Sequence, residues 1–140
     1  MKISVHAAVS LILAFASYPM FKWKVLLILV GGLLIDIDHY FWYVYKYNEF
    51  DVFSCYNFFT VDAEKTKWKY LIGRLLIFHT IEFFLIIILF SFYNQLILIF
   101  AIGLLSHYLL DLIWLRFILK RFILNHSILY WIYKDKIQKV

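Results

Sequence analysis

The stretch GGLLIDIDHY, residues 31–40, places two carboxylates and an imidazole inside a run of otherwise apolar residues. The run is long enough for a membrane-spanning helix, which needs about 20 mostly apolar residues. Each Asp near the centre of such a helix costs about 2.5–3.5 kcal/mol, whereas a large aliphatic residue contributes about −0.3 to −0.6 kcal/mol. Asp36 and Asp38 together would offset roughly ten favourable residues. We therefore expect both carboxylates to face away from lipid and toward a positive group.

The composition of the whole chain also favours an integral membrane protein. Of its 140 residues, 65% are hydrophobic and 22% are aromatic, whereas a soluble domain is usually about half apolar. This composition excludes disorder and low complexity. Cys55 is the only cysteine, which excludes an intrachain disulfide and a cysteine-based zinc motif. The length predicts a single domain over residues 1–140.

Long apolar segments predict the architecture. We expect an all-α fold, namely an integral membrane four-helix bundle followed by a basic interfacial C-terminal helix. An alternative interpretation makes the first segment a signal peptide, with residues 1–16 removed at a small-residue site. The predicted spans are about 3–21, 25–45, 71–92 and 96–118, and the interfacial tail is 119–140.

Basic residues predict the orientation in the membrane. They gather at the N-terminus, in the 46–74 connection and in the tail, whereas the opposite side holds only Lys22 and Lys24. Lys and Arg are enriched in short cytoplasmic loops. We therefore expect a multi-pass protein of the cell (inner) membrane with both termini in the cytoplasm. Because the basic residues flank apolar runs, we expect anionic lipid rather than nucleic acid to attract them.

Ionisable residues within the predicted spans fall at one depth, in the half that would face the cytoplasm. His107 and Asp111 are four residues apart and share a helix face. Gly103 precedes them on that face and would let another helix approach closely. His79 and Glu82 are three residues apart, which also predicts a shared face. The full set is His6, Asp36, Asp38, His39, His79, Glu82, His107 and Asp111.

Imidazole and carboxylate groups are ligands for zinc, and also for manganese or iron. Eight such groups could form a two-metal site, or one metal site whose histidines are oriented by further carboxylates. The alternative is a network of hydrogen bonds between helices without metal. His126, in the tail, is expected to be interfacial only.

The ordered motifs GGLLIDIDH, FHT and GLLSHYLLD, preceded by an early His, resemble a known family. It comprises small bacterial and archaeal membrane proteins classed as membrane-bound metal-dependent hydrolases, remotely related to zinc-dependent phospholipase C and zinc-dependent single-strand nucleases. The family pattern combines an early His, P-D-x-D-H, H-R-x-x-x-H-S and H-x-x-x-D. This chain departs from it at Ile35, Arg74 and Thr80, which replace a proline, a histidine and a serine. The matching residues are His6, Asp36, Asp38, His39, His79, His107 and Asp111.

The resemblance implies a metal-dependent hydrolase acting on a phosphodiester or another phosphate ester, such as a lipid head group. Asp36 or Glu82 would serve as general base or orient a ligand. The lipid bilayer is the expected partner, with a homo-oligomer or a partner protein as further expectations. Alternatives to the enzyme are a proton or cation pathway, a transporter subunit, and a non-catalytic membrane partner subunit. The implied ligands of a divalent metal, zinc first, are His6, Asp38, His39, His79, His107 and Asp111.

Overall fold

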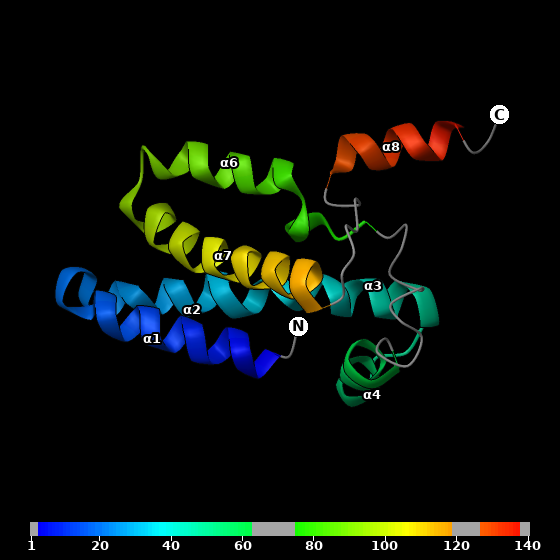
Figure 1. Ribbon diagram of the computed structural model, residues 1–140, viewed down its shortest axis with the longest axis horizontal. Coiled ribbons are helices and arrows are strands. Elements are labelled where there is room, and N and C mark those ends of the chain that lie inside the picture. The colour runs from blue at the N-terminus through cyan, green and yellow to red at the C-terminus, as the bar shows by residue number, and fades with distance from the viewer. Residues whose placement is uncertain (1–2, 63–74, 119–126, 138–140) are drawn as a thin grey trace. The chain divides into compact units, whose positions relative to one another are not determined.

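The computed structural model describes residues 3–62, 75–118 and 127–137, which form helices and turns and contain no strand. The all-α class predicted from the sequence is therefore confirmed for these residues (Figure 1). The α-helices are α1 (Ile3–Phe21), α2 (Leu26–Leu33), α3 (Ile37–Tyr47), α4 (Val52–Asn57), α6 (Ile81–Ser91), α7 (Gln95–Ile113) and α8 (Ile128–Ile137). Short 3-10 turns cover Lys22–Val25, Leu34–Asp36 and Ile77–His79, and π-helical turns cover Phe58–Asp62 and Trp114–Ile118.

The chain divides into two compact units, each built from two stretches of sequence. Unit 1 comprises Met1–Ile35 and Phe83–Phe122, and unit 2 comprises Asp36–Glu82 and Ile123–Val140. The length alone predicts one domain, and no composition shift marks the division. The boundary between the units falls within residues 31–40. Gly31 and Gly32 therefore belong to unit 1, and Asp36, Asp38 and His39 belong to unit 2.

Unit 1 is built on α1, α2 and α7, which lie side by side (Figure 1). Residues four apart share a helix face, and the buried positions of α1 follow that spacing at His6, Ser10 and Ala14. The same spacing joins the buried Ile99, Gly103 and His107 of α7. The apolar core comprises Ala14, Val25, Ile28 and Ile99. On α1 and α7, one face therefore carries both apolar core residues and a buried histidine.

Glycines bring the backbones of α2 and α7 together. A Cβ atom on Gly31 would overlap the carbonyl oxygen of Phe100, and one on Gly103 would overlap the carbonyl oxygen of Ile28. The close approach predicted at Gly103 is therefore confirmed, because only a residue without a side chain fits there. This contact also brings the C-terminal turns of α2 beside the buried histidine of α7.

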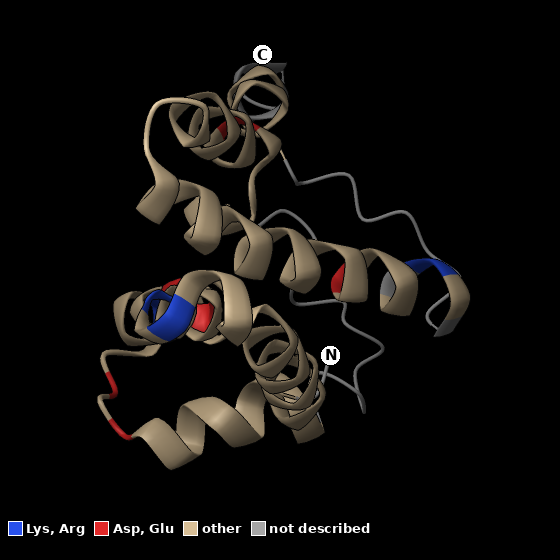
Figure 2. Cartoon of the chain, turned by 90° about the vertical axis from the view of Figure 1, so that its left-hand side faces the viewer, with Lys and Arg blue, Asp and Glu red and all other residues tan. Residues whose placement is uncertain are grey.

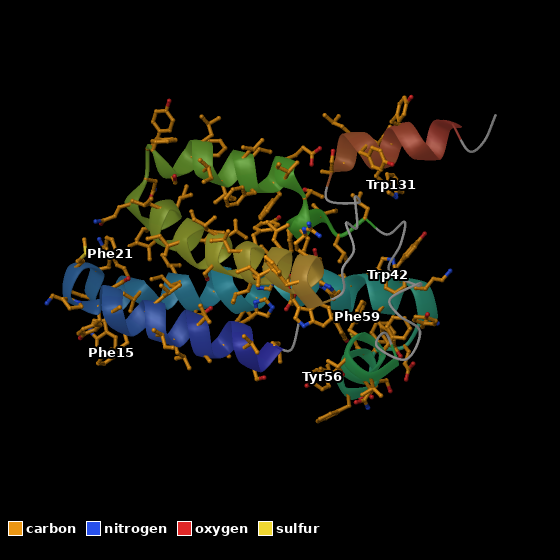
Figure 3. All side chains as sticks on the ribbon, viewed as in Figure 1. Phe15, Phe21, Trp42, Tyr56, Phe59 and Trp131 are labelled. Atoms are coloured by element: carbon orange, nitrogen blue, oxygen red, sulfur yellow. The ribbon has the colours of Figure 1, made fainter. Side chains whose placement is uncertain are left out.

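Unit 2 packs aromatic side chains of α3 against the turn that follows α4. Figure 3 labels Trp42 and Phe59, whose ring centroids lie 6.1 Å apart. Asn48 ends α3 in a left-handed conformation, with φ 53°, which asparagine adopts more readily than most residues. The carboxylate of Asp51 then accepts a hydrogen bond from Ser54 N at 2.7 Å and caps α4. The remaining rings of this cluster belong to Tyr43, Tyr47 and Phe58.

The predicted third span, residues 71–92, is not one continuous helix over its described part. A 3-10 turn over Ile77–His79 is separated from α6 by Thr80, which has an extended backbone. The Thr80 hydroxyl donates to Ile77 O at 2.8 Å, and the Asp38 carboxylate accepts from Phe78 N at 3.1 Å. These side chains satisfy backbone groups that a helix would otherwise pair, so one local and one long-range hydrogen bond compete successfully with the helix.

Several polar side chains are buried, and many large apolar side chains are exposed. His6 and His107 are each 1% exposed, whereas Phe15, labelled in Figure 3, is 85% exposed. Figure 2 shows that Lys, Arg, Asp and Glu occupy little of the helical ribbon. Large exposed apolar surfaces mark contact with protein or membrane. Among the described helices, Gln95–Ile113 is long and apolar enough to cross a membrane, and Ile81–Ser91 is apolar but shorter.

Several residues used in the sequence analysis lie outside the described ranges. They include the segment 71–74 at the start of the third predicted span and the segment 119–126 at the start of the tail. The residues concerned are Lys2, Lys65, Lys67, Lys69, Arg74, Lys120, Arg121, His126 and Lys139.

Candidate metal centres

Unit 1 brings together His6, His107 and Asp111, which we call the unit 1 cluster. His6 comes from α1, and the other two residues lie one turn apart on α7. The Nε2 atoms of His6 and His107 lie 3.3 Å and 3.2 Å from the two oxygens of the Asp111 carboxylate. The imidazole rings stack, with centroids 4.0 Å apart and an interplanar angle of 17°. Two buried imidazoles therefore present the same nitrogen to one carboxylate.

The hydrogen bond made by His107 Nδ1 determines whether its Nε2 atom is a donor or an acceptor. His107 Nδ1 lies 3.0 Å from the carbonyl oxygen of Gly32. A carbonyl oxygen only accepts, so Nδ1 carries the hydrogen and Nε2 of the neutral ring carries a lone pair. That lone pair faces an oxygen of Asp111, which is also an acceptor when ionised. Two acceptors facing each other in a buried site need a cation or a proton between them.

Without a metal ion, neutral His6 could donate from Nε2 to Asp111, and His107 alone would have to be protonated, because charging both rings is unfavourable. Two imidazolium rings 4.0 Å apart would repel by on the order of 4 kcal/mol at an effective dielectric constant of about 20. His6 Nδ1 is buried and has no hydrogen-bond partner in the described part of the chain. A divalent cation bound to the Nε2 atoms and to Asp111 would remove the need for a proton on either ring. The chemistry of this donor set therefore fits a metal ion.

The distances agree with that interpretation. Two atoms bound tetrahedrally to one zinc ion, each at about 2.0–2.2 Å, lie about 3.3–3.6 Å apart. The Nε2–oxygen separations of 3.2 Å and 3.3 Å in the unit 1 cluster are close to this range. One atom from each residue can be chosen so that all three lie within 4.8 Å of one another.

Unit 2 brings together Asp36, Asp38, His39 and His79, which we call the unit 2 cluster. His79 lies between two carboxylates, with Nδ1 3.0 Å from Asp38 and Nε2 3.3 Å from Asp36. His39 Nδ1 lies 2.9 Å from Asp38 and 3.4 Å from Asp36. Asp38 and His79 are buried, whereas the side chains of Asp36 and His39 are 28% and 22% exposed. The cluster therefore has a buried and a solvent-accessible side.

Asp38 orients this cluster. Its carboxylate accepts from the Nδ1 atoms of His39 and His79 and from the amide of Phe78. Because a carboxylate only accepts, both rings carry hydrogen on Nδ1, and Nε2 of His79 faces the second carboxylate, Asp36. Histidines that bind metals are commonly held through their other ring nitrogen in this way. Asp38 holds both rings as Gly32 O holds His107 in unit 1.

Glu82 lies elsewhere in unit 2, in the first turn of α6, and its carboxylate contacts the start of α8. Its carboxylate accepts from Ser127 Oγ at 2.6 Å and from the amides of Ile128 and Leu129 at 3.1 Å and 3.3 Å. Ser127 Oγ in turn accepts from the amide of Tyr130 at 3.2 Å. The two side chains satisfy the first three amides of the helix, which would otherwise lack partners. Glu82 is therefore a helix cap in this structure. It does not share a helix face with His79, because Thr80 between them is extended.

Seven of the eight residues singled out in the sequence lie in the two clusters, three in unit 1 and four in unit 2, and Glu82 does not. The groups that sequence reasoning missed are backbone atoms, the carbonyl of Gly32 and the amide of Phe78. No pattern of side chains in the sequence predicts a hydrogen bond to a particular backbone group. The only signal was indirect, since the glycines of α2 predict the close approach that brings Gly32 beside α7.

Comparison of the chain with protein-family models, with curated proteins and with solved structures gave no match. The resemblance to membrane-bound metal-dependent hydrolases therefore stays a hypothesis based on the motifs quoted above.

Proposed function

We propose that the protein is a membrane-embedded hydrolase that depends on divalent metal ions, zinc foremost, with manganese or iron as alternatives. One observation carries the proposal. His107 donates from Nδ1 to Gly32 O and directs Nε2 at the Asp111 carboxylate. Directed in this way, Nε2 of His107 and the Asp111 carboxylate can bind one metal ion together.

In unit 1, His6, His107 and Asp111 would hold one ion through the two Nε2 atoms and a carboxylate oxygen. His6 Nδ1 has no hydrogen-bond partner in the described chain, so the position of His6 depends on stacking against His107 and on its ligand. Asp111 is the accessible member, with its side chain 21% exposed against 1% for His6. Substrate would therefore approach from the Asp111 side.

In unit 2, the geometry favours roles for the two aspartates that are opposite to those assigned from sequence. Asp36 faces His79 Nε2 and is the more exposed carboxylate, so it takes the position of a ligand. Asp38 accepts from both imidazoles and takes the orienting role. His39 and His79 would then act as ligands or bases through Nε2.

When bound, a divalent ion at such a site acts as a Lewis acid and makes hydroxide available near neutral pH. The chain's own contribution is to hold His39, His79 and His107 through Nδ1, which directs the Nε2 atoms of His79 and His107 at carboxylates. The buried histidines exclude water from one side of each cluster, and the carboxylates leave the other side open. The resemblance suggests a phosphodiester or another phosphate ester as substrate, such as a lipid head group.

A membrane location is supported by the distribution of side chains. Large apolar residues on the outside and buried histidines on the inside suit a lipid solvent. The apolar helix Gln95–Ile113 supports at least one span, and four spans with both termini in the cytoplasm follow from the sequence pattern.

The hypothesis that the protein is a hydrolase is tested on full-length protein reconstituted in liposomes with zinc, manganese or iron. We expect hydrolysis of bis(p-nitrophenyl) phosphate that is lost in His107→Ala and retained in Asp51→Asn, a change in the exposed cap of α4. Metal-loaded protein that hydrolyses neither this diester nor p-nitrophenyl phosphate would contradict the hydrolase. Proton or cation flux in those liposomes would identify a transport pathway instead, and neither activity would favour a partner subunit.

A further inference from the structure

The outward face of α8 is apolar. The exposed fractions of Leu129 and Tyr133, which are four residues apart, are 71% and 64%. Tyr130 and Ile132, on either side of them around the helix, are each 42% exposed. At 3.6 residues per turn these four side chains share one broad face. Ile128 and Trp131 lie outside that arc and are less exposed; Trp131 is labelled in Figure 3.

The N-terminus of α8 is held firmly, although its outer face has no described partner. Glu82, Ser127 and the amides of residues 128–130 form the cap described above. Glu82 is 45 residues distant from Ser127 in sequence, so this bond ties α8 to the start of α6. The N-terminal end of α8 is therefore anchored by hydrogen bonds, while its apolar face is exposed.

Basic residues follow the apolar face in sequence. Lys134, Lys136 and Lys139 outnumber the single acidic residue, Asp135, between Ser127 and Val140. Lysines in the last turn of a helix also complement its dipole, but that role accounts for neither the exposed leucine and isoleucine nor the two tyrosines. Exposed aromatic residues beside lysines are typical of helices in the head-group layer of a bilayer.

We propose that α8 docks on the anionic surface of the bilayer, with Leu129, Ile132 and Tyr133 entering the head-group layer. The lysines that follow in sequence make this end of the chain basic, which favours acidic lipids. This inference rests on the membrane location in the proposed function and is independent of metal binding. A second copy of the chain is the alternative occupant, which the crosslinking experiment below tests.

The test uses the full chain in nanodiscs of phosphatidylcholine, with or without phosphatidylserine. An environment-sensitive fluorophore is attached at Tyr133→Cys in a Cys55→Ser background, and a quencher is carried on the lipid head group. We expect quenching to rise when phosphatidylserine is present and to fall when salt is added. Lys134→Gln and Lys136→Gln should each weaken docking by about fivefold. Lys46→Gln, on α3, is the matched control and should leave the quenching unchanged.

Quenching that ignores both phosphatidylserine and salt would overturn the recognition of anionic lipid. Efficient crosslinking between residues 133 of two chains would assign the face to a second copy instead. Metal content is measured on the same samples. Loss of docking with normal metal content overturns only this inference, whereas docking without metal overturns only the metal-dependent function.

Discussion

His107 and Gly32 are joined by a hydrogen bond of 3.0 Å between the ring Nδ1 atom and the peptide carbonyl, across 75 residues of sequence. This bond sets the tautomer of the imidazole and aims its Nε2 atom at Asp111, 3.2 Å away. It depends on the close contact of α2 with α7, which two glycines permit. The geometry of the proposed metal site is therefore coupled to the packing of unit 1.

Enlarging Gly103 should disturb both packing and site. Gly103→Ala places a methyl group against the carbonyl oxygen of Ile28, so α2 and α7 must separate. Overpacking of this kind typically costs about 1–3 kcal/mol of stability. We expect a lower midpoint of thermal unfolding in detergent and weaker metal binding. Leu109→Ala, at an exposed position of the same helix, is the control, and an equal loss in both variants would contradict the role of the close contact.

Asp38 should control the unit 2 cluster without binding metal itself. Asp38→Asn keeps the shape but leaves one acceptor oxygen for three converging donors, His39 Nδ1, Phe78 N and His79 Nδ1. Loss of such an orienting carboxylate typically weakens metal affinity about 10–100-fold. Calorimetric titration with zinc in the His107→Ala background isolates the unit 2 cluster. Unchanged affinity in the double variant would assign Asp38 no orienting role.

Glu82 should stabilise α8 and not the metal sites. Removing a helix cap typically costs about 0.5–2 kcal/mol. In Glu82→Ala, we expect faster hydrogen exchange at the amides of Ile128 and Leu129, which now donate to its carboxylate. Metal content should stay at the wild-type value. A drop in metal content with unchanged hydrogen exchange at these amides would instead place Glu82 in the metal site, as its sequence position predicts.

Cys55 should react slowly in the folded protein. Burial raises the pKa of its thiol to about 11, and the thiolate is the reactive form. Against an ordinary thiol of pKa about 8.5, the thiolate fraction near pH 8 falls by about two orders of magnitude. Alkylation by iodoacetamide should accelerate correspondingly when the chain is denatured. Equal rates in folded and denatured protein would show that Cys55 is accessible and its thiol unperturbed.

Apolar run length predicted the existence of most helices, because burial and helix formation both follow from it. The segment predicted over 3–21 has the bounds of α1, and the one predicted over 96–118 is helical throughout in α7 and the turn after it. The predicted helix over 71–92 is interrupted because the Asp38 carboxylate and the Thr80 hydroxyl take over backbone groups near Phe78. Such long-range competition for hydrogen bonds leaves no periodic trace in sequence.

Helical spacing predicted the part of the candidate site that lies on one helix. His107 and Asp111 do share a face, because α7 is regular between them. The stacking of His6 on His107 and the bond from His79 to Asp38 join distant segments. Neither could be derived from spacing, since each depends on how separate elements pack.

The central claim is that the His6, His107 and Asp111 side chains bind a divalent metal ion. Elemental analysis of full-length protein purified in detergent without added chelator tests it most directly, with His107→Ala beside the wild type. We predict one to two zinc, manganese or iron ions per wild-type chain, and about one fewer in folded His107→Ala. Folded wild-type protein with well under one ion per chain and no added thermal stability on zinc addition would contradict the claim. Full metal occupancy in His107→Ala would contradict it as well.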